Sequence, residues 1–173
     1  MHAKTKTSDI QQKKAEDTCR VIYSETRKYY DNVIEKLGDT ALGFRILYGP
    51  PMMNSPFLFL GFQPGGRKIE YLDHHETWPN VCDYITRDWP LAKQVRSIFG
   101  TDIVKHCTGL NAIFFRAPSM RAWNKISRPL RHNLENFSRE HAEQIVRALN
   151  PEYIIVIGLS TFDRLSKGET ALL

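Results

Sequence analysis

The feature that most constrains the fold is a continuous apolar run at residues 56–61, which has turn-forming residues on both sides. A strand that is buried on both faces has this pattern, because neither of its faces needs polar residues. Two more strands are predicted downstream, at residues 106–115 and 153–157. Apolar strands that alternate with helices are typical of a mostly parallel sheet covered on both faces. The sequence therefore predicts an α/β fold, with a short, mostly parallel central sheet in a three-layer α/β/α arrangement.

The helices are predicted from the spacing of apolar residues and from their end signals. Gly38 and Gly100 stand where helix C-caps are expected, Pro90 lies in a first turn, and Ser138 is a natural N-cap. Helices are predicted at residues 8–37, 89–99 and 138–149, and a short strand at residues 44–48. We expect residues 1–40 to form a helical segment that packs on a single domain, residues 41–173.

Composition and charge limit the classes of partner. The 173 residues carry a net charge of +5, which permits a polyanionic partner but does not demand one. The three cysteines are odd in number and widely spaced, which favours reduced thiols over a disulfide framework or a metal knuckle. No apolar run approaches the roughly 18 residues of a membrane span, and the lysine-rich N-terminus is not a secretory signal. We expect a cytoplasmic protein.

In parallel α/β sheets the ligand site lies beyond the carboxyl ends of the strands. The residues that follow the predicted strands are 62–66, 115–118 and 158–161. In the first of these segments, glycines let the backbone turn tightly and approach a ligand, and Gln63 presents an amide. The alternative is a strand-ending turn without a function.

Asn111 stands inside an otherwise apolar strand. A buried amide is costly unless its hydrogen bonds are made. Either the backbone satisfies this side chain, or the amide faces a pocket. In a pocket its donor and acceptor would match the O4/N3–H edge of uracil or a similar group.

The long segment between the first strand and residue 88 contains a polar cluster, Asp73, His74, His75 and Glu76. His74 or His75 is a candidate general acid or base, and an ordinary cluster of loop charges is the alternative. Metal ligation lacks a second ligand pair at a recognisable spacing, so no metal is expected. Trp78, Tyr84 and Trp89 are available to stack on a base or to fill the core.

Basic residues follow the second predicted strand. Arg116, Arg121 and Lys125 are the first of a cluster that extends to Arg131. Such residues suit contacts with nucleic-acid phosphates, and a solvated basic linker is the alternative.

Three segments together resemble the uracil-DNA glycosylase superfamily. Residues 57–66 (FLFLGFQPGG) look like its first motif, in which a buried strand ends in Gly-x-Asp-Pro or Gly-x-Asn-Pro-Gly. Residues 108–118 (TGLNAIFFRAP) are similar to the strand whose asparagine reads the uracil edge. Residues 151–165 (PEYIIVIGLSTFDRL) resemble the third strand and the following helix.

The resemblance implies a pocket for a flipped-out base and hydrolysis of an N-glycosidic bond in DNA repair, without a cofactor. Asn111 falls on the base-reading asparagine, and Gln63 on the acid or amide that positions the attacking water. Phe62, Pro64 and Gly65 would shape the pocket and the turn that faces DNA.

Two departures from the family pattern lower the activity that we expect. Gln63 is not an acid, and its side chain is one methylene longer than asparagine. A His-Pro-Ser type motif after a fourth strand, whose histidine stabilises the departing base, is not found in the 173 residues. Several interpretations stay open: a truncated enzyme, a non-catalytic module that binds nucleic acid or a base, or a homodimer or other complex that pairs through the open sheet edge. An unrelated α/β enzyme that uses residues 73–76 is a further alternative.

Overall fold

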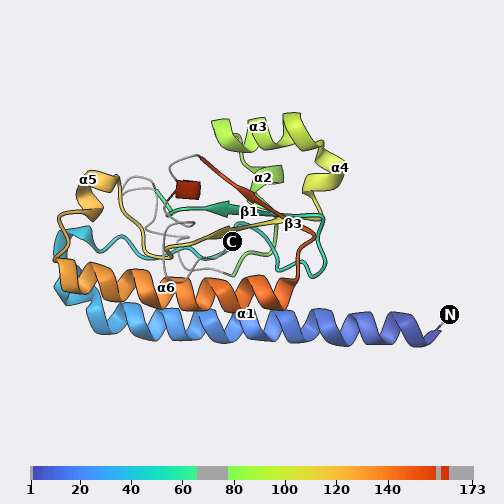
Figure 1. The fold of residues 1–173 in the computed structure, drawn as a ribbon, viewed down its shortest axis with the longest axis horizontal. Helices are drawn as coiled ribbons and strands as arrows, with labels where there is room; N and C mark the ends of the chain where they lie inside the picture. Colours follow the sequence, from blue (N-terminus) through green and yellow to red (C-terminus); the bar gives the residue numbers. More distant parts are fainter. Residues whose placement is uncertain (1, 66–77, 159–160, 164–173) are drawn as a thin grey trace.

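Three parallel strands form the central sheet (Figure 1). The computed structural model describes residues 2–65, 78–158 and 161–163. It places β1 (Phe57–Gly61) between β2 (Thr108–Asn111) and β3 (Tyr153–Val156). The side chains of β1 are buried on both faces of the sheet, as the apolar run predicts. The predicted α/β class and the parallel sheet are therefore confirmed.

Helices lie on both sides of this sheet (Figure 1). The long helices α1 (His2–Leu37) and α6 (Arg128–Leu149) run side by side on one side. The short helices α2 (Asp83–Thr86) and α4 (Thr101–Val104) lie on the other side, together with α3 (Pro90–Phe99). Because side chains alternate along a strand, Leu58 and Leu60 join the core beneath α1 and α6, and Phe59 joins a second core beneath α2 and α3.

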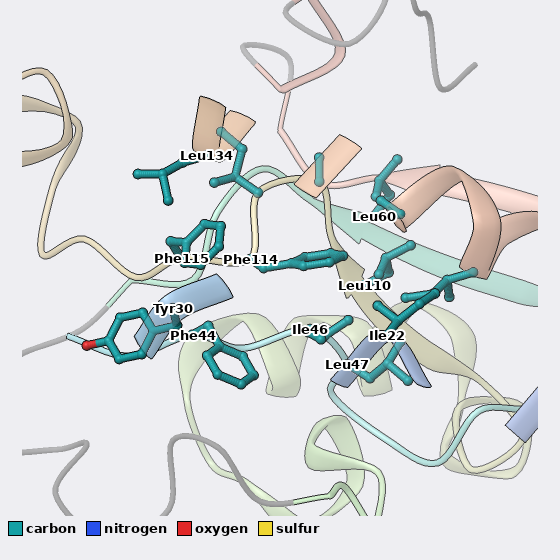
Figure 2. Close-up of a cluster of buried hydrophobic side chains, with 14 of the residues drawn as sticks. Ile22, Tyr30, Phe44, Ile46, Leu47, Leu60, Leu110, Phe114, Phe115 and Leu134 are labelled. Atoms are coloured by element: carbon teal, nitrogen blue, oxygen red, sulfur yellow. The ribbon is translucent and has the colours of Figure 1, made fainter. Parts of the chain in front are cut away.

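The larger core is built from distant parts of the chain. Ile22 and Tyr30 of α1, Leu134 of α6 and Phe114 meet the sheet side chains there (Figure 2). At its C-terminal end α1 is followed by a 3-10 helix, η1 (Gly38–Thr40), in which Gly38 has a positive φ. The helix α1 begins at His2, earlier than the sequence predicts.

The boundaries of α3 are confirmed. Pro90 is its first residue, and Gly100 follows its end with φ +79° and donates its N–H to the carbonyl of Arg96. A left-handed residue after the last turn suits glycine, since glycine carries no Cβ. Two local signals were sufficient to place this helix.

The predicted start of the last long helix is wrong. α6 begins at Arg128, after Ser127, and a short helix, α5 (Met120–Trp123), precedes it in the basic segment after β2. Ser138 lies inside α6 and is buried. Its hydroxyl donates to the Leu134 carbonyl at 2.7 Å and accepts the Phe114 N–H at 3.1 Å. Ser138 therefore ties the helix to the chain after β2 and does not cap it.

The segment at residues 44–48 flanks β2 on the side away from β1. It forms isolated antiparallel bridges, Phe44 with Phe115 and Leu47 with Leu110, in place of the predicted strand. Further backbone bonds join Arg45 N–H to Phe114 and Tyr48 N–H to Gly109. This segment covers one edge of the sheet, whereas β3 has no strand on its outer side among the described residues.

Candidate functional site

A cleft of about 1010 Å³ opens at the carboxyl ends of the three strands. It is lined by residues that directly follow each strand. These are Phe62, Gln63, Pro64 and Gly65 after β1, Arg116 after β2, and Ile157 and Thr161 after β3. Asn111, the last residue of β2, also lines it. The structure thus brings together residues that the sequence analysis selected from distant segments of the chain, and Tyr84 and Trp89 line the same cleft.

Asn111 lies opposite Gly61 in the sheet and is only 2 % exposed. Its Nδ2 donates to the carbonyl of Arg45 at 3.0 Å. A Cβ atom at position 61 would lie 3.2 Å from Asn111 Oδ1, so glycine at that position leaves room for the amide. The sequence left two roles open for Asn111, an amide satisfied by the backbone or an amide that faces a pocket. Both apply in part, because the backbone holds the amide and the residue still lines the cleft.

Gln63 connects the ends of two strands. Its Nε2 donates to the carbonyl of Phe115 at 2.9 Å, which fixes the amide across the turn after β1. An amide oxygen accepts hydrogen bonds but does not take up a proton near neutral pH. Gln63 is therefore able to orient a water molecule, but it is not a general base.

Other selected residues lie elsewhere. Trp78 packs edge-on against Tyr23 of α1, with ring centroids 5.2 Å apart, and the guanidinium of Arg20 lies 4.0 Å from its ring centre. It is not among the residues that line the cleft. Arg121 and Lys125 are exposed and follow Ser119 and Met120, which do line it. His75 and its neighbours in the polar cluster lie outside the described residues.

A buried ion pair at the cleft was not foreseen. Arg45 Nη2 bonds Asp83 Oδ2, and the side chains are only 14 % and 8 % exposed. Arg45 also donates from Nε to the Leu47 carbonyl at 3.0 Å, and the Asp83 N–H donates to the Tyr48 carbonyl at 2.7 Å. The sequence did contain one signal for this pair, since Arg45 is a charged residue within the otherwise apolar segment at residues 44–48. Asp83 had none, because its partner is 38 positions away.

Aromatic side chains form another part of the lining. Tyr48, Tyr84 and Trp89 contact one another, and Trp89 meets Tyr48 at 89° and Tyr84 at 85°. Burial raises the pKa of the Tyr84 hydroxyl well above its ordinary value, so this group stays neutral. The Trp89 Nε1–H is buried and has no hydrogen-bond acceptor within the described part of the chain. These rings offer flat apolar surface of the kind on which bases stack.

Comparison of the chain with protein-family models, with curated proteins and with solved structures finds no match. The resemblance to uracil-DNA glycosylases therefore depends on the quoted motifs alone. None of the described helices is both long enough and apolar enough to cross a membrane. Among the same residues, no three His, Cys, Asp or Glu side chains are grouped so that they could hold a metal ion.

Proposed function

We propose that this protein is a uracil-DNA-glycosylase-like protein of DNA repair, which binds a flipped-out base in the cleft. The single observation that carries the proposal is the meeting of Gln63 and Asn111, two amides from different strands, in one cleft beside aromatic rings. Amides supply the paired donors and acceptors that read a base edge, and the rings supply stacking surface. The charge of the described lining residues also suits a nucleic acid, since three arginines stand against one aspartate.

The proposed reaction is hydrolysis of the N-glycosidic bond. Water oxygen attacks the sugar C1′, the bond to the base breaks, and the base leaves with the electron pair and takes up the proton that the water loses. Asn111 holds the base, and Gln63 orients the water. Arg116, Arg121 and Lys125 contact phosphates. We expect slow turnover, because Gln63 cannot take the proton of the water.

The finer fold is part of the same proposal. The strand order β2-β1-β3, with α1 and α6 on one side and α2 to α4 on the other, supports a three-layer domain like that of the glycosylases. The three buried cysteines are all free thiols, which supports a reducing compartment such as the cytoplasm.

The experiment is a glycosylase assay on single- and double-stranded DNA that contains uracil, with abasic sites as the product. We expect product from the parent chain and none from Asn111→Ala. Asn136→Ala is a matched control, since it removes an exposed amide that contacts His132 on α6, away from the cleft lining. Equal product from all three proteins would contradict the role of Asn111.

A non-catalytic module that binds a base or nucleic acid is the alternative within the same fold. The amide at position 63 favours it, because a carboxylate is the usual acceptor of a proton from water. DNA binding that weakens steeply with salt and yields no abasic product would support this alternative. In that case Asn111→Ala would lower the affinity for uracil-containing DNA, whereas Asn136→Ala would not.

Pairing of two copies of the chain is a second candidate function, and the edge of β3 favours it. The N–H groups of Tyr153 and Ile157 bond toward β1, so those of Ile154 and Val156 point to the outer side. An uncharged edge of this kind is a template for pairing. Sedimentation equilibrium should show a dimer, which Ile154→Pro abolishes because proline removes the outward N–H. Ile98→Lys, on the exposed surface of α3, should leave the dimer intact. A monomer at all concentrations would contradict the pairing.

A further inference from the structure

The segment from Asp83 to Trp89 forms a part of the cleft that the proposed function does not yet use. Two of its side chains are acids, and each acid has an arginine of its own. Asp83 pairs with the buried Arg45, and Asp88 pairs with Arg96 at 3.1 Å. The segment also contains a basic residue of its own, Arg87, which lines the cleft.

Arg87 is only weakly engaged by its acidic neighbour. Its Nε lies 4.0 Å from Asp83 Oδ1, and its side chain is 56 % exposed. A pair at this distance and exposure contributes little, and Arg45 already holds the same carboxylate. The Arg87 guanidinium is therefore free to exchange this contact for a stronger one with an anionic group in the cleft.

Arg96 fixes the backbone from which Arg87 projects. Its Nη1 donates to the carbonyl of Tyr84 at 2.6 Å and to that of Arg87 at 2.8 Å. Its Nη2 bonds Asp88. These carbonyls lie at the end of α2, where no further turn of helix satisfies them. One guanidinium thus holds the connection between α2 and α3 in a single shape.

We propose that Arg87 binds the phosphate of a nucleotide whose base lies at Asn111, and that Arg96 is the positioning residue for Arg87. The inference rests on the proposed function, and it names the ligand as a nucleotide unit and not a bare base. The planar guanidinium presents paired N–H donors that match two phosphate oxygens. The acids at positions 83 and 88 do not repel the phosphate, because each is neutralised by its own arginine.

The experiment compares the affinity for deoxyuridine with that for its 5′- and 3′-monophosphates, measured by titration calorimetry. We expect one monophosphate to bind about tenfold more tightly than the nucleoside, as one charge-assisted contact allows. Arg87→Ala should remove this gain and leave deoxyuridine binding unchanged. Lys105→Ala is a matched control, since Lys105 follows α4, pairs with Asp102 of that helix and does not line the cleft.

The role of Arg96 is tested with Arg96→Lys, which keeps the charge but not the fork that reaches several acceptors. We expect the phosphate gain to be lost in this variant, with deoxyuridine affinity retained. Adding Arg87→Ala should then cause no further loss, a coupling that a general loss of stability would not produce.

The outcomes separate the two proposals. Deoxyuridine binding with no gain from phosphate, or a gain that persists in Arg87→Ala, would overturn the phosphate site and leave the base site standing. Binding of a monophosphate that depends on Arg87, without any deoxyuridine binding, would remove the base site and leave an anion site. A protein that binds neither probe would overturn both.

Discussion

Replacing Gly109 with alanine is expected to destabilise the protein and to disturb the cleft. Gly109 lies in the middle of β2, with the ring of Tyr84 packed against its Cα. A Cβ atom there would lie 2.6 Å from Tyr84 Cε2, 2.9 Å from the Tyr84 hydroxyl and 3.1 Å from Tyr48 Cβ. The first two distances are shorter than any tolerated carbon contact, so Tyr84 or the strand has to move.

Two opposing effects set the magnitude. Alanine restricts the unfolded chain more than glycine does, which favours the variant by roughly 0.5–1 kcal/mol. Overpacking of a filled site costs about 1–3 kcal/mol. Tyr84 is only 2 % exposed and is held by Trp89 and Phe59, so the ring has no easy escape. We expect a net loss of about 1–2 kcal/mol, which lowers the melting temperature by roughly 2–8 °C.

Urea unfolding followed by circular dichroism measures this loss. Gly65→Ala is the matched control, because a Cβ atom there would meet no heavy atom of the described residues within 4 Å. In a Tyr84→Leu background the alanine at position 109 should cost less, since the ring that it meets is gone. Gly109→Ala with the stability of the parent chain would refute the packing of Tyr84 on β2, and with it the aromatic part of the cleft.

Three further predictions concern the site and the core. Gly61→Ala should weaken deoxyuridine binding with little change in stability, because the new Cβ would lie 3.2 Å from Asn111 Oδ1; calorimetry and urea unfolding measure the two effects. Arg45→Met should lower the free energy of unfolding by about 3 kcal/mol, since it leaves Asp83 buried without its nearest cation; a stable variant would show that the pair contributes nothing. Burial raises the pKa of the Cys19 thiol from its ordinary 9.0 to about 12. The unfolded chain therefore releases this proton first, and stability should fall as the pH rises from about 9 toward about 12, less steeply in Cys19→Ala, as urea unfolding at several pH values would show.

The sheet and α3 were predictable because their signals are local. An apolar run between turns indicates a strand whatever lies far away in the chain, and proline and glycine mark the two ends of α3. The part of the cleft after the strands follows from topology, since the carboxyl ends of parallel strands share one edge of the sheet. Gln63 and Asn111 were found in this way.

Features that depend on tertiary contacts were missed. Ser138 has the residue type of a helix cap, but its hydroxyl is used inside α6, where Phe114 supplies a donor from the chain after β2. Trp78 was a candidate both for stacking on a base and for filling the core, and the partners that place it at the core, Tyr23 and Arg20, come from the distant helix α1. Neither contact has a signature within a short stretch of sequence.

The cleft therefore consists of two parts with different origins, and this difference bears on function. Strand topology places the amides of Gln63 and Asn111, which decide what kind of group the cleft recognises. Ion pairs place the connection between α2 and α3, since Arg45, which is distant in sequence, holds Asp83, and Arg96, eight positions along the chain, holds Asp88. The Arg45 carbonyl also holds the Asn111 amide, whereas Arg96 holds the backbone at Tyr84 and Arg87, so a change of Arg96 shifts only the part that carries Arg87. Selectivity for the group attached to the base is thus separable from recognition of the base itself, because different contacts hold the two parts in place.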